Sequence, residues 1–211
     1  MSSFWRAPSC SEWSAAATTS MSEERTRWED RYAAGAGGDG PSEFLMAHAA
    51  LLHGRVLDVA AGAGRNALFL ARRGLHVDAI DIALTGLRIA QSTARAEGLQ
   101  LHGVQADLES FPLPHARYDA AINIRYLQRS LFAPLQRAVK PGGIILFETF
   151  LIDQQEIGHP RNPAFLLRRG ELRAAFSACD ILVYEEGRFH SGAQSAYLAR
   201  MVARRPSRQV D

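Results

Sequence analysis

An acidic residue stands directly before a turn of very small residues, an arrangement that could hold a small charged ligand. Asp58 lies within the apolar run 56–59, and residues 60–64 (AAGAG) have almost no side chains. Such a turn lets a ligand approach the backbone closely, and the open N–H groups of a following helix attract negative charge and lone pairs. The carboxylate of Asp58 at the mouth of the turn would attract a positively charged group. The stretch 56–71 therefore predicts a ligand-binding strand–turn–helix unit.

The same stretch fits the relaxed dinucleotide-binding pattern GxGxxG/A over residues 62–67, with Asp81 downstream as an acid for a ribose. This alternative is an NAD(P)-dependent oxidoreductase. Against it, the charge of Asp58 would face the pyrophosphate of a dinucleotide, and no Ser/Tyr/Lys or His/Asp set for hydride transfer follows in the sequence. The residues therefore favour a cationic ligand with a free amino group over a dinucleotide.

Short apolar runs alternate with amphipathic segments from residue 21 onward, a pattern typical of α/β proteins. The last two expected strands have no helix between them and should pair as a hairpin across residues 187–192. We expect strands at 56–59, 75–80, 101–105, 118–124, 144–150, 181–185 and 195–203, and helices at 24–34, 42–54, 66–73, 85–97, 131–139 and 171–177. Thr85 should cap its helix, 141–143 should form a turn, and 152–163 should form an irregular loop. The expected fold is a seven-stranded, mostly parallel sheet with helices on both faces and an antiparallel C-terminal hairpin.

Five motifs in this order resemble the class I S-adenosylmethionine (SAM)-dependent methyltransferases. DVAAGAGRN looks like the first motif of that family, an acid followed by GxGxG, with Ala60 in place of the first glycine. Asp81 closes VDAID at the position of the family's ribose-binding acid, and Asp107 and Leu108 of QADLESFPL match its adenine site. YDAAINI and LQRAVKPGGIILFETF resemble its fourth and fifth strands. The resemblance extends from about residue 28 to 203 and implies a Rossmann-like fold with SAM as the cofactor.

A finer resemblance is to small-molecule methyltransferases of the tellurite-resistance and thiopurine type. Trp28 and Tyr32, in WEDRYAAG, look like the W-x3-[WY]-x2-G helix that covers the cofactor in that group. The ordinary alternative is that both rings belong to the hydrophobic core. This resemblance implies a small-molecule methyl acceptor, whose identity depends on loop shape and cannot be read from motifs.

The resemblance implies a cofactor site that contains more residues than the acids alone. Its expected members are Trp28, Tyr32, Asp58, Ala60, Gly62, Gly64, Asp81, Ile82, Asp107, Leu108 and Asn123. The alternatives are structural, because Asp58 and Asp81 could cap helices and Asp107 could close a solvated turn. Asn123 is expected to offer its backbone carbonyl to an amino group. NIRY at 123–126 lacks both prolines of the [ND]PP[YFW] motif of nucleic-acid amino-methylating enzymes, which disfavours that function.

The sulfonium of SAM is already activated, so catalysis would depend mainly on proximity and alignment. A thiolate or similar soft anion would need no general base, whereas an oxygen or nitrogen acceptor would need one. The candidate catalytic residues are therefore His159 and Tyr126, on the expected loops after strands five and four. A histidine in such a loop is more often an ordinary surface residue. No HxxxH, HExxH or Cys/His cluster suggests a metal.

The composition is that of an ordinary globular protein. The chain has 211 residues, a formal net charge of +2, and 47% hydrophobic residues. These values exclude a disordered chain and give no indication of a nucleic-acid or membrane partner, while Cys10 and Cys179 form no paired motif. We expect a cytoplasmic protein with a disordered leader at 1–21, for which Met21 is an alternative start. A single methyltransferase domain is expected at 22–204 and a frayed tail at 205–211, and the oligomeric state cannot be predicted.

Overall fold

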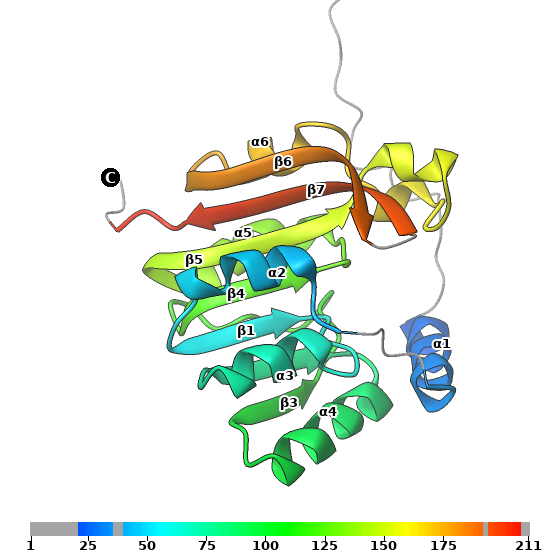
Figure 1. The fold of residues 1–211 in the computed structure, drawn as a ribbon, viewed down its shortest axis with the longest axis vertical. Coiled ribbons are helices and arrows are strands. Elements are labelled where there is room, and N and C mark those ends of the chain that lie inside the picture. Colours follow the sequence, from blue (N-terminus) through cyan, green and yellow to red (C-terminus); the bar gives the residue numbers. More distant parts are fainter. Residues whose placement is uncertain (1–20, 36–39, 192–193, 208–211) are drawn as a thin grey trace, which may run out of the picture.

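The computed structural model describes residues 21–35, 40–191 and 194–207 (Figure 1). These residues form one β-sheet with helices on both faces. Of the expected leader, residues 1–20 lie outside the described part of the chain, as do residues 208–211 of the expected tail.

The seven strands follow the order β3-β2-β1-β4-β5-β7-β6. Strands β1 to β5 are parallel to one another, while β7 pairs antiparallel with β5 and β6. The strand order reverses beside β1, and open α/β sheets bind ligands at such a point, outside the carboxyl ends of the strands. The strands are β1 (Arg55–Val59), β2 (His76–Asp81), β3 (Leu101–Gln105), β4 (Tyr118–Ile124), β5 (Val139–Phe150), β6 (Asp180–Ser191) and β7 (Gln194–Arg204). This topology confirms the expected fold class.

The helices divide between the two faces of the sheet. Figure 1 shows α2, α3 and α4 in front of the sheet and α5 and α6 behind it, with α1 beside α4. The α-helices are α1 (Met21–Ala33), α2 (Glu43–His48), α3 (Arg65–Arg72), α4 (Leu84–Ala96), α5 (Phe132–Ala138) and α6 (Glu171–Ala175). Short 3-10 helices are η1 (Ala49–Leu51), η2 (Arg129–Leu131), η3 (Ile152–Glu156) and η4 (Pro163–Phe165).

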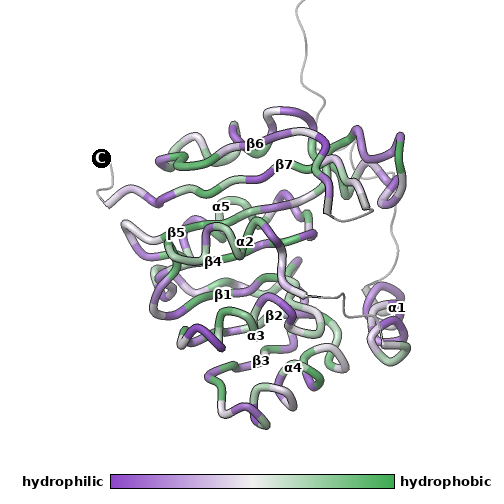
Figure 2. The backbone as a smooth tube through the Cα atoms, in the orientation of Figure 1, coloured by the Kyte–Doolittle hydropathy of each residue, from purple (hydrophilic) through white to green (hydrophobic). Residues whose placement is uncertain are grey.

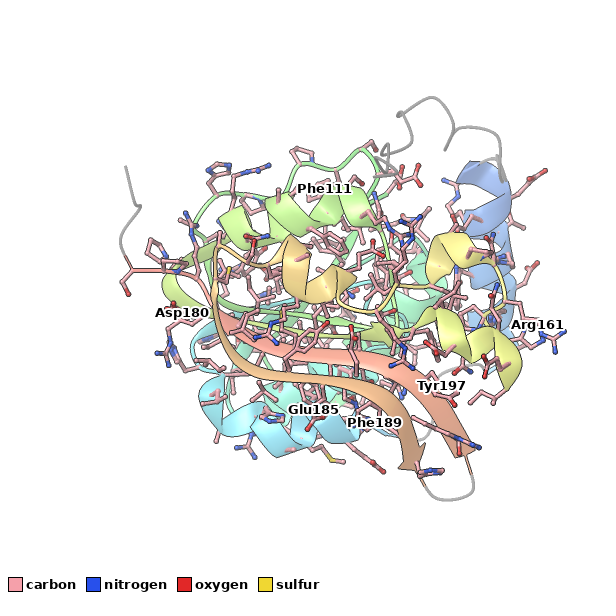
Figure 3. All side chains as sticks on the ribbon, turned by 90° about the horizontal axis from the view of Figure 1, so that it is seen from above. Phe111, Arg161, Asp180, Glu185, Phe189 and Tyr197 are labelled. Carbon is pink, nitrogen blue, oxygen red and sulfur yellow. The ribbon has the colours of Figure 1, made fainter. Side chains whose placement is uncertain are left out.

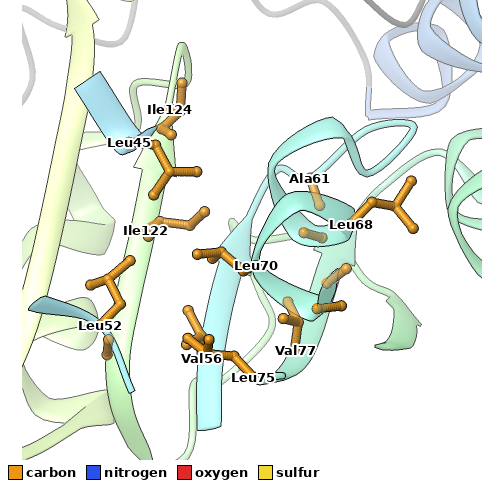
Figure 4. Packing of buried hydrophobic residues seen from close by; sticks show 14 of the residues in the cluster. Leu45, Leu52, Val56, Ala61, Leu68, Leu70, Leu75, Val77, Ile122 and Ile124 are labelled. Carbon is orange, nitrogen blue, oxygen red and sulfur yellow. The ribbon is translucent and has the colours of Figure 1, made fainter. Parts of the chain in front are cut away.

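Two apolar layers attach these helices to the sheet. The layer under α2, α3 and α4 includes Leu45, Val56, Leu70 and Ile122 (Figure 4). The layer under α5 and α6 includes Leu57, Leu135, Phe147 and Phe176. Along the backbone, hydrophobic residues concentrate in the central strands, whereas α1 is largely hydrophilic (Figure 2). Because α1 contributes little to either layer, it must be attached mainly by polar contacts.

Local expectations about segment ends and loops are wrong at four places. Thr85 does not cap α4, because the N-cap residue is Ala83 and Thr85 lies within the first turn. The expected turn at 141–143 is part of β5, because its backbone exchanges hydrogen bonds with Arg205. Strands β6 and β7 remain paired as far as Ser191 and Gln194, so the hairpin connection is much shorter than 187–192. The segment 152–163 contains η3 rather than only irregular chain.

A helix that crosses a membrane must be long and predominantly apolar. None of the helices in residues 21–35, 40–191 and 194–207 is long and apolar enough to cross a membrane.

Gly64 shows how closely the helices beside the first strand pack. Its φ is +78°, and a Cβ added there would lie 2.5 Å from the Cβ of Ala90 on α4. Gly74 has a similar φ of +85° but nothing within 4 Å of an added Cβ. We therefore expect Gly74→Ala to lower the free energy of unfolding by about 1 kcal/mol, and Gly64→Ala by roughly 2–4 kcal/mol. Denaturant unfolding of both variants measures the difference, and equal losses would contradict the close packing.

Candidate functional site

The carboxyl ends of β1 and β2 place two acids beside the small-residue turn. Asp58 lies opposite Ala79 of β2 and Ile122 of β4, and Asp81 is the last residue of β2. The turn 60–64 leaves β1 at the same edge and leads directly into α3. The structure thus brings the two acids and the turn together at the point where the strand order reverses.

Asp81 joins the loop after β1 to the loop after β2. Its Oδ2 accepts a hydrogen bond from the backbone N–H of Gly62 at 2.8 Å, and its Oδ1 accepts one from Ala83 at 2.8 Å. Burial raises the pKa of Asp81, and these two hydrogen bonds oppose that rise. A carboxylate can accept about four hydrogen bonds, so two lone-pair positions remain for the hydroxyl groups of a ligand.

The turn after β1 needs left-handed backbone at three positions. The φ angles are +54° at Ala60, +57° at Gly62 and +78° at Gly64. This conformation costs alanine about 1–2 kcal/mol and glycine almost nothing. Ala60 therefore retains the backbone of the glycine it replaces at an energetic cost. An added Cβ on Gly62 would lie 2.3 Å from the hydroxyl oxygen of Tyr32, so this position requires glycine while α1 covers the turn.

Asp58 is a buried acid with one oxygen unused. The residue is 1% exposed, and its Oδ2 has no hydrogen-bond partner in the described part of the chain. Burial and the nearby charge of Asp81 raise the pKa of Asp58 to about 8, although Arg65 and the Ala67 N–H oppose the rise. The acid is therefore mostly protonated at neutral pH, and a cation placed beside it would stabilise the carboxylate. An unpartnered buried carboxyl oxygen next to an open turn fits a ligand with an ammonium group.

Glu29 attaches α1 to α4. Its two carboxylate oxygens accept hydrogen bonds from the backbone N–H groups of Leu84 at 2.7 Å and Thr85 at 2.8 Å. These N–H groups belong to the first turn of α4 and have no carbonyl partner within the helix. Burial would raise the pKa of Glu29, but the hydrogen bonds from Thr85 and Leu84 lower it overall. Glu29 thus provides the cap that the sequence suggested for Thr85.

Of the aromatic residues of α1, Tyr32 lies against the turn, and neither Tyr32 nor Trp28 belongs to the two buried apolar layers. Tyr32 is half-buried with its hydroxyl above Gly62, and burial together with the charge of Asp81 raises its pKa to about 12. Trp28 stacks on Tyr32 with 5.8 Å between ring centroids. The guanidinium of Arg31 lies 4.7 Å from the centroid of Trp28. The covering role of both rings stays a prediction.

The expected adenine side of the site lies on the loop after β3. One oxygen of Asp107 accepts a hydrogen bond from the backbone N–H two residues later at 2.9 Å, so this acid also closes its own turn. Leu108 is buried and Ile82 is half-buried. The backbone N–H of Ala106 donates to the carbonyl of Asp81 at 3.0 Å, which holds this loop beside the acid of β2.

Asn123 and Tyr126 shape the loop after β4. The Asn123 side chain is buried and donates a hydrogen bond to the carbonyl of Tyr126 at 2.7 Å, so its amide serves the turn. The Tyr126 hydroxyl bonds to Gln128. Burial raises the pKa of Tyr126, and the negative charges of residues including Asp107 and Asp81 add to the rise. Tyr126 therefore remains neutral at physiological pH.

His159 lies on the exposed loop after β5, apart from these residues. Its side chain is exposed, and its backbone carbonyl accepts a hydrogen bond from Gln154 at 3.1 Å. Arg161, two residues further, is also exposed and points away from the body of the protein (Figure 3). The structure gives no contact between His159 and the turn after β1 in the residues that it describes. Among those residues, no three His, Cys, Asp or Glu side chains are grouped so that they could hold a metal.

Sequence reasoning missed Glu29 and a charged cluster formed by residues at the ends of β4 and β5 and within β7. In this cluster, Glu148 is 1% exposed and forms ion pairs with Arg125 and Arg200. The only sequence signals were the place of Glu29 next to Trp28 and a lone acid inside the otherwise apolar run GIILFETF. Neither signal identifies a partner, because the partners lie far away in the sequence.

Comparisons with known proteins agree on the class of domain. Residues 56–143 match the family described as "Methyltransferase domain". The chain is 36% identical over 99 residues to a malonyl-[acyl-carrier protein] O-methyltransferase of Pseudescherichia vulneris, covering 44% of this chain and 38% of that protein. It is 32% identical over 113 residues to a ubiquinone biosynthesis O-methyltransferase of Nitrosococcus oceani, covering 51% and 48%. The chain thus spans less than half the length of these two curated relatives.

Two solved structures share the fold at low sequence identity. TehB from Haemophilus influenzae has a TM-score of 0.69 at 19% identity, covering 84% of this chain and 67% of that one. Geranyl diphosphate C-methyltransferase from Streptomyces coelicolor, solved with S-adenosyl-L-homocysteine, has a TM-score of 0.67 at 14% identity, covering 90% and 99%. At these identities the likeness establishes the fold alone.

The Glu29 contact predicts how firmly α1 is held. Replacing Glu29 with Ala removes both caps of α4, so the amides of 24–33 should exchange with deuterium at least about tenfold faster. Because the pKa of Glu29 is lowered, the attachment should be present above the ordinary pKa of a glutamate and lost as the pH falls through the lowered value.

The matched control is Asp30→Ala, an exposed acid on the same helix. Amide exchange followed by mass spectrometry should leave this control like the wild type. Unchanged protection of α1 in the Glu29 variant would show that other contacts hold the helix.

Proposed function

We propose that this chain, which carries a class I SAM-dependent methyltransferase domain, binds SAM and transfers its methyl group to a small-molecule acceptor. The observation that carries the proposal is the unpartnered, buried oxygen of Asp58 beside a turn of alanines and glycines only. An ammonium beside this acid would stabilise its ionised form, whereas a pyrophosphate would not, and this difference favours SAM over a nicotinamide dinucleotide.

The described residues fit the cofactor part by part. Asp58 would hold the ammonium group, and the free lone pairs of Asp81 would accept hydrogen bonds from the ribose hydroxyls. Asp107 and Leu108 would bind the adenine, with Ile82 beside them. Ala60, Gly62 and Gly64 would let the cofactor approach the backbone, and Asn123 would offer its carbonyl. Trp28 and Tyr32 would cover the cofactor from α1.

When bound, SAM supplies a methyl group on a positively charged sulfur, and attack by the acceptor's lone pair leaves a neutral thioether. The chain's part is to hold the acceptor in line and to exclude water. Tyr126 has a raised pKa and stays protonated, so it would not act as a base, and because its hydroxyl proton is donated to Gln128, its oxygen would accept a hydrogen bond from a ligand. His159 would act as a base only if its exposed loop folds towards the site, and a soft anionic acceptor would need neither residue.

The proposal also covers the acceptor atom, the bounds of the domain and the location of the protein. The curated relatives are O-methyltransferases by name, which supports an oxygen acceptor as readily as the thiopurine-like resemblance supports sulfur. We place the methyltransferase domain at residues 22–204 and the protein in the cytoplasm. The formal net charge of +2 gives no support to nucleic acid as a partner.

Two experiments test the function. Calorimetric titration with SAM, S-adenosylhomocysteine, NADH and NADPH should show binding of the first two only, whereas nicotinamide binding would indicate an oxidoreductase. Incubation with methyl-labelled SAM and a panel of thiols, phenols and amines should then label at least one acceptor. Cofactor binding without any labelled product would indicate a scaffold.

The raised pKa of Asp58 predicts a pH-dependent affinity. At pH 7 the free protein carries a proton on Asp58, since the pKa is about 8, and an ammonium beside the carboxylate would lower that pKa and release the proton. Affinity for S-adenosylhomocysteine should therefore rise as the pH increases from 6 to 8, by up to roughly tenfold per pH unit.

Calorimetry in two buffers of different ionisation enthalpy measures this proton release. Asp58→Asn keeps the shape, and should abolish the release and flatten the pH profile. Release that persists in Asp58→Asn would assign the proton to another group.

A further inference from the structure

We propose that the methyl acceptor carries an anionic group, a carboxylate or phosphate, which is bound by the guanidinium of Arg125 together with Arg65. This inference rests on the proposed function, because it names the class of acceptor for the same site. It derives from a surplus of partly buried positive charge at the ends of the central strands, next to the turn after β1.

Arg125 is held in an unfavourable backbone conformation at the end of β4. Its φ is +62°, and its backbone N–H donates a hydrogen bond to the carbonyl of Glu148 at 2.7 Å. A non-glycine residue pays about 1–2 kcal/mol for this conformation. Such strain persists where the surrounding structure requires the side chain in a particular place, and it is commonest at ligand sites.

The negative charge of Glu148 does not balance the positive charges of the arginines around it. Glu148 Oε1 accepts a hydrogen bond from Nε of Arg125 at 3.1 Å, and Oε2 accepts one from Nε of Arg200 at 2.8 Å. One carboxylate is thus shared between two guanidinium groups. Arg65 adds a third positive charge, close enough to lower the pKa of Arg125 in addition to the effect of burial.

The hydrogen-bond donors of Arg125 and Arg65 are only partly used. Within the described part of the chain, Arg125 bonds to Glu148 through Nε alone, and Arg65 donates to the carbonyl of Gly40 at 3.1 Å. The Arg125 side chain is 31% exposed, so its terminal nitrogens can meet a ligand. A planar guanidinium with free terminal N–H groups matches a carboxylate or phosphate geometrically.

The cluster lies next to the proposed methyl site. Arg65 is the first residue of α3, directly after the small-residue turn, and its charge acts on both Asp58 and Arg125. Arg125 stands between Ile124, the last residue of β4, and Tyr126. Asn123 of β4 pairs with Val59 of β1, so the ends of the two strands are adjacent. An anion on Arg125 would therefore place the rest of the acceptor near the turn.

Aromatic rings beside the arginines suit the carbon skeleton of such an acceptor. The Arg125 guanidinium lies 4.6 Å from the centroid of Phe150, a half-buried residue. Arg200 lies 3.8 Å from the centroid of Phe189, on the β6–β7 ribbon (Figure 3), and 5.5 Å from that of Phe44. These cation–π contacts fix the guanidinium planes. The arrangement favours small anions with an apolar or aromatic body.

The test compares matched probes on protein saturated with S-adenosylhomocysteine, whose own binding is measured first. Benzoate and phenyl phosphate carry the two candidate anions, and benzamide is the neutral counterpart of benzoate. Ligand-observed NMR should show at least one anion binding about tenfold or more tightly than benzamide. The stronger of the two anions identifies the group. Failure of S-adenosylhomocysteine to bind would instead overturn the proposed function.

Variants of Arg125 and Arg65 test whether these arginines cause the preference for the anion over benzamide. Arg125→Asn tolerates left-handed backbone but lacks the charge, and should abolish the preference for the anion. Arg125→Lys should retain part of it. Arg65→Gln removes the second guanidinium and should weaken the preference for the anion. Because Arg65 is not a partner of buried Glu148, this variant also provides a test if Arg125→Asn does not fold. Arg72 lies at the far end of α3, where it forms an ion pair with Glu97. Arg72→Gln should therefore leave the preference for the anion unchanged.

Three results would overturn the inference. These are benzamide binding as tightly as both anions, the absence of binding by either anion at millimolar concentration, and a preference that survives in both Arg125→Asn and Arg65→Gln. Titration with S-adenosylhomocysteine sets the concentration that saturates each folded variant, so loss of the anion site is separated from loss of the cofactor site.

Discussion

The carboxylate of Asp81 is the interaction on which the rest of the site depends. It accepts hydrogen bonds from Gly62 in the loop after β1 and from Ala83 before α4, so one side chain fixes two loops at the switch point. Between these hydrogen bonds the turn holds left-handed backbone at Ala60, Gly62 and Gly64, and its side chains are no larger than a methyl group. Without this carboxylate, the loop after β1 and the segment before α4 would lose the side chain that connects them.

Charge at the site is arranged in two separate regions. Two buried acids, Asp58 and Asp81, lie at the ends of β1 and β2, where burial raises the pKa of each. The positive charges of Arg125 and Arg200 lie beside Glu148 on the side of β4, β5 and β7, and Arg65 adds a third at the start of α3. A cationic cofactor and an anionic acceptor would each meet the opposite charge, and the two sites would adjoin at the start of α3.

The sequence predicted the parts that depend on neighbouring residues. The strand, turn and helix at 56–71 form one continuous pattern, and the fold class follows from the alternation of such patterns. The cap on α4 could not be predicted, because Glu29 reaches Leu84 and Thr85 from a helix more than fifty residues away. The same applies to Glu148, whose partners follow from strand order rather than local sequence. The hairpin length was missed because pairing continues through polar residues that carry no apolar signal.

A crystal structure of the chain with S-adenosylhomocysteine tests the central claim most directly. The account predicts the ribose hydroxyls on Asp81, the amino group beside Oδ2 of Asp58, and the sulfur directed towards the loop that contains Arg125 and Tyr126. A ligand bound elsewhere, or a turn filled by the side chains of α1 with the two acids directed away from the ligand, would contradict it.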